Sequence, residues 1–238
     1  MKGKTIAIPV REDAIIDFRF LTAMRGVHDI LEYAGIKMDE VNIQYIPCKN
    51  IKDKRTTGLD TLNKDSDFMT EDFVAVLEGK VDAVFDHSIK AVRHDQAGIV
   101  RDILAEDEKK NIKNINNNAV LAITCTKPFA YEHPEIVVTY LKEVIKAGRY
   151  AGIHHEDFLD AAASGVYGAT PAEMALSFDN DYLFNRVPEL SEKSFELLSD
   201  QKEFIIKCGK ICRENDFDVR DWADKSFLDK ALQELDSL

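Results

Sequence analysis

Apolar positions in the first part of the chain switch repeatedly between a strand pattern and a helix pattern. The short apolar run at 5–9 predicts a buried strand, and apolar residues spaced three or four apart through 20–34 predict one face of a helix. Gly35 is typical of a helix end, and the alternation over 41–46 predicts a second strand. The chain is therefore predicted to begin with a strand, a helix and a strand.

The same alternation resumes after a polar stretch. Residues 48–65 show no periodicity and predict a long surface loop. A helix that begins near Thr70, a short strand at 83–85 and a helix over 88–96 are predicted next. Because strands that alternate with helices form parallel sheets, residues 1–118 are predicted to be a small doubly wound α/β lobe.

The second half of the chain shows a different pattern. An apolar run at 119–124 predicts one more strand, and from Pro134 onward the apolar spacing is helical throughout. Amphipathic helices must bury their apolar faces on a partner layer. We therefore expect residues 119–238 to hold a crossover strand and helices of another lobe, most of whose strands would precede residue 1. A self-contained helical subdomain is the alternative.

Composition limits the class of partner. The chain has 238 residues, 45% of them hydrophobic and 31% charged, and a formal net charge of -12. Scattered cations in an acidic chain argue against binding to nucleic acid, which requires clustered Lys and Arg. No apolar stretch reaches the roughly 20 residues of a membrane span. No glycine-rich phosphate loop is present, and no cofactor is predicted.

The N-terminus bears on localisation. Met1 leads directly into Lys2–Pro9 without an apolar signal segment, so a cytoplasmic location is expected for the sequence as written. A periplasmic or other extracytoplasmic location is expected if an N-terminal segment has been removed.

Cysteine and histidine offer few metal ligands. Four cysteines are too few and too dispersed for a disulfide framework, so we expect them to be reduced: Cys48, Cys125, Cys208 and Cys212. The last two are spaced i,i+4 on a predicted helix and could share a metal, although cysteine is also a common core residue. Residues 154–156, His-His-Glu, are better explained as a solvated helix-entry loop than as ligands. No metal site is predicted.

Several segments resemble those of known proteins. Lys2–Pro9 is similar to the start of the second lobe of sulfonate-, taurine- and nitrate-type solute-binding proteins of ABC transporters, and Leu77–Phe85 and Lys127–Glu135 resemble later segments of the same proteins. Within that superfamily the chain most resembles the aryl-sulfinate desulfinases, which remove sulfite from hydroxybiphenyl sulfinate. The segments similar to the desulfinases follow in order to the C-terminus: Asp67-Phe68, Gly79–Ala83, Ala147–Ala151, Asp221–Ala223 and Phe227-Leu228.

This resemblance implies a fold and a ligand class. The implied fold is α/β and periplasmic-binding-protein-like (type II), with one complete doubly wound lobe and a helix-rich remnant of the other. The implied function is binding of a small organic anion of the sulfonate, sulfinate or aromatic acid type, as in ABC transporter solute-binding components. In desulfinases the nucleophilic cysteine lies in the N-terminal part of the first lobe, for which this chain has no counterpart, and none of the four cysteines matches it.

Two alternatives follow from the same resemblance. One is a desulfinase-like hydrolase of a C–S bond whose catalytic N-terminal segment is absent from this sequence. The other is a truncated paralogue whose exposed apolar surface is covered by a missing-lobe partner or by a second copy in a homo-oligomer.

Candidate binding residues follow from the rule that ligands of doubly wound lobes meet the loops at the carboxyl ends of strands. Arg11 follows the first predicted strand and could pair bidentately with a carboxylate or sulfonate; a surface salt bridge with Glu12 or Asp13 is the alternative. An aromatic ring, a carboxylate, an imidazole and a hydroxyl follow the strand at 83–85: Phe85, Asp86, His87 and Ser88. We expect Arg11 and this segment to face one cleft.

A third candidate place precedes the helix near Thr70. Phe68 could form a wall for an apolar ligand while Asp67 caps the helix. A hydrophobic staple, in which Phe68 packs on the helix itself, is the alternative.

Overall fold

A computed structural model of the chain describes residues 1–12, 14, 17–48, 70–86, 88–98, 100–104, 122–164, 169–177, 186–210 and 216–237. The chain divides into two compact units. Unit 1 consists of residues 1–118 and 159–178, and unit 2 of residues 119–158 and 179–238. The assignment of the second half to another lobe stays a prediction.

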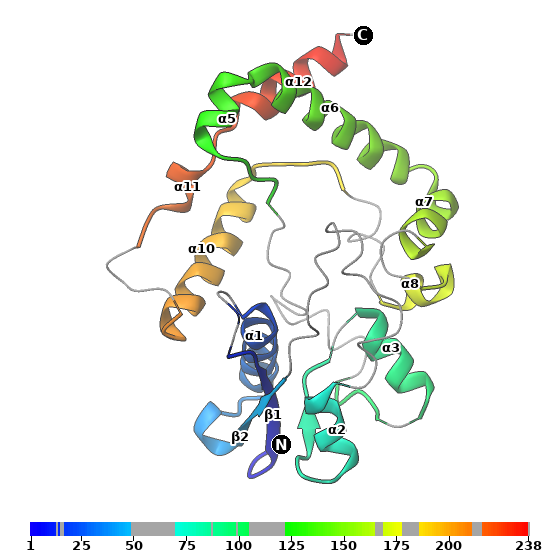
Figure 1. Cartoon of the computed structure of the whole chain (residues 1–238), viewed down its shortest axis with the longest axis vertical. Helices are drawn as coiled ribbons and strands as arrows, with labels where there is room; N and C mark the ends of the chain where they lie inside the picture. Colours follow the sequence, from blue (N-terminus) through cyan, green and yellow to red (C-terminus); the bar gives the residue numbers. More distant parts are fainter. Residues whose placement is uncertain are drawn as a thin grey trace. The chain divides into compact units, whose positions relative to one another are not determined.

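Unit 1 contains a parallel three-stranded sheet in the order β2-β1-β3 (Figure 1). The strands are β1 (Thr5–Val10), β2 (Asn42–Pro47) and β3 (Ala83–Val84). Residues 6–8 of the central strand are at most 3% exposed, because β1 has a neighbour on each side and helices pack against it. The predicted α/β class is confirmed, and each predicted strand of this unit is present to within one residue at either end.

Among the described residues of unit 1, four α-helices and a short 3-10 helix accompany this sheet: α1 (Phe18–Tyr33), η1 (Met38–Glu40), α2 (Glu71–Leu77), α3 (Ser88–Gln96) and α8 (Pro171–Ser177). Asp17 caps α1 at its start. Gly35, with φ of +65°, follows the end of α1, and this helix end was predicted from the sequence. Ala75 of α2 packs with Ala7 of β1 and with Val81 in a small buried cluster.

Unit 2 is helical in its described residues. Its helices are α5 (Lys127–Glu132), α6 (Pro134–Ala151), α10 (Glu192–Lys207), α11 (Val219–Trp222) and α12 (Ser226–Asp236). Helix α7 (His155–Ala162) contains the boundary between residues 158 and 159. One buried apolar cluster of the unit lies between α6 and α12 and contains Val138, Leu141, Ile145, Leu228 and Ala231 (Figure 1). Among the described helices, none has the length and apolar character that crossing a membrane requires.

Two sequence predictions are contradicted within the described residues. The predicted strand at 119–124 is not seen in its described part, because residues 122–126 are exposed and lie beside no strand of the described sheet. The helix predicted to carry Cys208 ends before it, because α10 stops at Lys207 and Gly209 adopts φ of +69° just beyond it. Cys212 itself lies outside the described residues.

Candidate functional site

The carboxyl ends of the three parallel strands meet at one edge of the sheet. Arg11 follows β1, Cys48 follows β2, and Phe85 and Asp86 follow β3. The amide of Cys48 donates to the carbonyl oxygen of Val10 over 2.9 Å, which continues the β1–β2 pairing into this edge. This is the edge at which ligands of open parallel sheets bind.

Arg11 is anchored through its backbone. Its amide donates to Oδ2 of Asp17 over 2.6 Å, and its carbonyl oxygen accepts from the amide of Ala14 over 3.3 Å. The other carboxylate oxygen of Asp17 accepts from the amide of Phe20 over 3.0 Å and so caps α1. One buried carboxylate thus fixes the end of β1 to the start of α1.

The side chain of Arg11 is half-buried. Its Nε atom is buried and has no hydrogen-bond acceptor among the described residues. The alternative of a salt bridge with Glu12 is not seen, and Asp13 lies outside the described residues. The role of Arg11 in ligand binding stays a prediction that this geometry favours.

Asp86 is held by two side chains of α3. Its Oδ2 lies 2.5 Å from Nδ1 of His94, and its Oδ1 lies 3.5 Å from Nζ of Lys90. Lys90 also donates to the hydroxyl of Thr70 over 3.2 Å, which ties α3 to the start of α2. His94 is fully buried and stacks on the ring of Phe73, with centroids 3.5 Å apart.

Sequence reasoning missed His94, because it paired Asp86 with the adjacent residue His87. The i,i+4 spacing of Lys90 and His94 on the predicted helix was the signal that could have found it, since it places both side chains on one face. His87, Asp67, Phe68 and the side chain of Ser88 lie outside the described residues.

Phe85 packs on α1. A Cβ atom built at Gly26 would overlap the ring of Phe85, so the ring lies directly against the helix backbone. Phe85 is half-buried and keeps part of its surface in solvent. The expectation that Arg11 and residues 85–88 face one cleft stays a prediction.

Cys48 is the one described cysteine at this edge, and it is buried. Its Sγ lies 3.9 Å from Oδ1 of Asp72, which also accepts from Nη2 of Arg19 over 3.3 Å. Burial, followed by the charge of Asp72, raises the pKa of Cys48 to about 11. Cys48 is therefore a neutral thiol at neutral pH and not the thiolate that nucleophilic catalysis requires.

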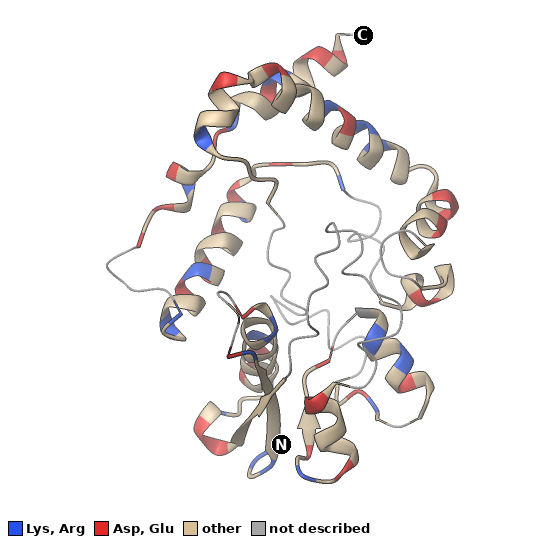
Figure 2. Ribbon diagram, in the orientation of Figure 1, with Lys and Arg blue, Asp and Glu red and all other residues tan. Residues whose placement is uncertain are grey.

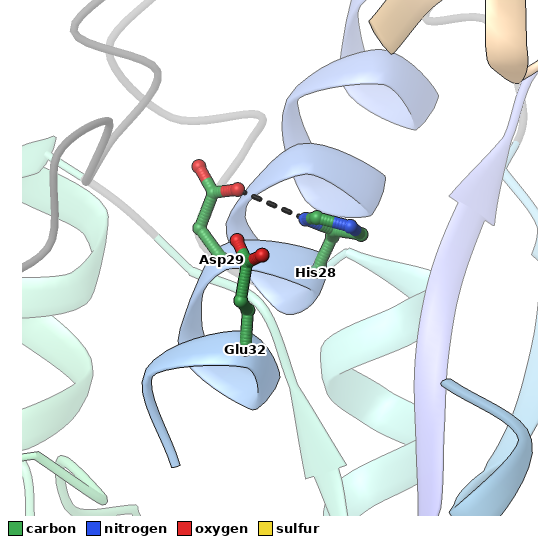
Figure 3. A group of neighbouring side chains, drawn as sticks. All are labelled: His28, Asp29 and Glu32. Carbon is green, nitrogen blue, oxygen red and sulfur yellow. Dashed lines mark hydrogen bonds and ion pairs between the residues drawn. The ribbon is translucent and has the colours of Figure 1, made fainter. Parts of the chain in front are cut away.

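One cluster on α1 has the composition of a metal site. Ligand atoms of His28, Asp29 and Glu32 lie within 4.8 Å of one another (Figure 3). However, Oδ2 of Asp29 accepts from Nε of Arg25 over 2.8 Å, and its Oδ1 lies 3.0 Å from Nδ1 of His28. Because the guanidinium of Arg25 is buried against this carboxylate, it would repel a metal ion there. The arrangement is an ion-pair network on a helix.

The helix entry predicted at 154–156 is seen, but only His154 lies in the loop, because His155 and Glu156 form the first turn of α7. His154 precedes α7 and stacks on the ring of Tyr150 with centroids 4.1 Å apart, and Nε2 of His155 lies 3.1 Å from the carbonyl oxygen of Gly152. Lys and Arg are interspersed with Asp and Glu along the helices of each unit (Figure 2).

No protein-family model matches this sequence, and no curated protein matches it significantly. Solved structures do match. A crystal structure of a cysteine-to-serine mutant of DszB in complex with biphenyl-2-sulfinic acid matches with a TM-score of 0.63 and 18% identity. A crystal structure of the desulfurization enzyme DszB matches with a TM-score of 0.65 and 16% identity. Each match covers 98% of this chain and 71% of the other.

These likenesses concern the fold. Both matched structures are of a desulfurization enzyme, so they support the desulfinase resemblance of the sequence and give no support to the solute-binding-protein resemblance. This chain has a DszB-like fold.

Proposed function

We propose that this chain is a desulfinase-like protein that binds an aryl sulfinate or a closely related aromatic anion. The observation that carries this proposal is the fold likeness over 98% of the chain to a protein that was solved with biphenyl-2-sulfinic acid bound.

The residues at the carboxyl edge of the sheet support the same ligand class. An aryl sulfinate consists of an apolar ring system and a small anionic group with two oxygens. Arg11, at the end of β1, offers a guanidinium for the anion, and Phe85, at the end of β3, offers a half-exposed ring for the aryl part. Asp67, Phe68, Asp86, His87 and Ser88 complete the proposed ligand-binding set.

The second candidate function is hydrolysis of the bound sulfinate, favoured by the fold likeness to a desulfurization enzyme. The reaction breaks the bond between the aryl carbon and sulfur. Water supplies the proton that the carbon gains and the hydroxyl that the sulfur gains, so ArSO2⁻ and H2O give ArH and HSO3⁻. We do not assign the nucleophile to Cys48, because its raised pKa keeps it protonated.

Calorimetry with biphenyl-2-sulfinate, combined with an assay for released sulfite, tests both functions. Binding without sulfite release supports the first candidate alone, and binding with sulfite release supports both. A ligand at a hundred times its dissociation constant should also raise the free energy of unfolding by roughly 2.7 kcal/mol. Unsubstituted biphenyl is the control for the anionic group. Absence of heat and of thermal stabilisation with the sulfinate would contradict the proposal.

A further inference from the structure

A buried cationic donor without an acceptor lies at the carboxyl end of β1. Nε of Arg11 is inaccessible to solvent and has no hydrogen-bond partner among the described residues. Arg11 as a whole is half-buried, but a donor atom that is shielded from solvent and unpaired still costs free energy, so a bound ligand or an ordered water is expected to pair with it.

Three of the described acids at the same edge are engaged by other groups, and the exposed Glu12 forms no salt bridge with Arg11. Asp17 accepts from two backbone amides, and Asp72 lies against Arg19 and Cys48. Asp86 lies against His94 and Lys90. Each of these three carboxylates contacts other groups, and none of them forms a salt bridge with the guanidinium of Arg11.

Arg11 is also held in place before any ligand arrives. Its amide and its carbonyl oxygen are both hydrogen-bonded, and the preceding residue, Val10, is paired to Cys48. A guanidinium on an anchored backbone loses less freedom on binding than one on a mobile loop.

We propose that Arg11 is the oxyanion receptor of this chain, and that its Nε and one terminal nitrogen donate to two oxygens of the ligand. The planar fork of a guanidinium fits a group that presents two oxygens side by side, as a sulfinate or a carboxylate does. The choice of sulfinate rests on the proposed function, whereas the subsite itself rests on the unpaired donor.

The test compares Arg11→Met and Arg11→Lys with the wild-type chain. Arg101→Met is the matched control, because Arg101 is an exposed arginine of the same unit. Affinities for biphenyl-2-sulfinate and biphenyl-2-carboxylate are measured by calorimetry, and the melting temperature is measured without ligand.

We expect Arg11→Met to weaken binding by roughly 10- to 100-fold. Arg11→Lys should weaken it as well, because an ammonium cannot form the two-donor fork. The melting temperature of unliganded Arg11→Met should equal or exceed that of the wild type, since the substitution removes an unsatisfied buried donor. Arg101→Met should change neither quantity.

The outcomes separate this inference from the proposed function. If both Arg11 variants bind the sulfinate as tightly as the wild type does, the inference is overturned and the proposed function stands. Arg11-dependent binding of the carboxylate without binding of the sulfinate supports the inference and overturns the proposed ligand. Lack of binding to either anion overturns both. A clear loss of melting temperature in unliganded Arg11→Met also counts against the inference, because it would mean that a protein group already pairs with Arg11.

Discussion

The guanidinium of Arg93 forms a two-point salt bridge with the carboxylate of Glu173. Its Nε lies 2.7 Å from Oε1 and its Nη2 lies 3.3 Å from Oε2. Oε2 also accepts from the amide of Thr170 over 2.7 Å, so one carboxylate starts α8 and joins it to α3. Because α8 belongs to residues 159–178, this pair attaches that segment to the first part of unit 1.

Glu173→Gln should therefore destabilise unit 1. The substitution keeps the shape of the side chain and removes its charge, and we expect the free energy of unfolding to fall by roughly 1–2 kcal/mol at neutral pH. Urea denaturation measures the change. Asp236→Asn is the control, because it removes the more exposed pair with Arg149, whose Nη2 lies 3.0 Å from Oδ1, and should cost about 0.5 kcal/mol or less. Equal losses of unfolding free energy in the two variants would show that the salt bridge between Arg93 and Glu173 contributes no more than an exposed one.

The same pair predicts a pH dependence. Arg93, followed by the amide of Thr170, lowers the pKa of Glu173 from 4.5 to about 2. Because the folded pKa lies below the unfolded one, the stabilisation is complete above pH 4.5 and is lost as the pH falls toward 2. The difference in melting temperature between the wild type and Glu173→Gln should shrink over this interval. A difference that stays constant down to pH 2 would mean that the carboxylate charge is not responsible.

For Gly26→Ala the structure predicts the sign of the change in the free energy of unfolding. In an exposed helix interior, replacing glycine by alanine adds roughly 1 kcal/mol of stability. At residue 26 the new Cβ would overlap the ring of Phe85, so we expect Gly26→Ala to lower the free energy of unfolding by roughly 1–3 kcal/mol. Adding Phe85→Ala should recover part of that loss, since it removes the overlapping ring. Stabilisation by Gly26→Ala in thermal denaturation would show that the ring and the helix are not in contact.

Sequence patterns predicted the elements of unit 1 well because each depends on local spacing. The helix at 88–96 was predicted with its observed ends, and Gly35 marked the end of α1 through its left-handed conformation. The position of Arg11 at a strand end followed from the same reasoning. The burial of its Nε without a partner among the described residues could not be predicted, because it depends on which acids fold beside it.

Contacts between elements were harder to predict than the elements themselves. The pairing of Asp86 with His94 requires α3 to turn one particular face toward β3. The shared helix face assigned to Cys208 failed for a local reason, since Gly209 stops the helix one turn too early. The strand predicted at 119–124 failed in its described part because an apolar run forms a strand only where another strand pairs with it.

The contact between His94 and Asp86 should make the effects of substituting these two residues on the free energy of unfolding interdependent. His94→Phe keeps a flat ring on Phe73 and leaves the carboxylate without its imidazole partner, so we expect a loss of roughly 3 kcal/mol in the free energy of unfolding. A double-mutant cycle with Asp86→Asn measures the coupling by urea denaturation. The double variant should lose less than the sum of the two single variants, because each single variant already removes the contact between the two side chains. Strict additivity would show that the two side chains do not interact.

Cys48 should be unreactive in the native chain. With a pKa of about 11, roughly one thiol in a thousand is ionised at pH 8, and the side chain is also buried. Alkylation with iodoacetamide, followed by peptide mass spectrometry, should label the exposed Cys125 quickly and Cys48 only after unfolding in urea. Cys48→Ala should leave any release of sulfite from biphenyl-2-sulfinate unchanged, because a neutral buried thiol is not the nucleophile. Rapid native labelling of Cys48, together with loss of sulfite release in Cys48→Ala, would instead place an activated thiolate at the end of β2.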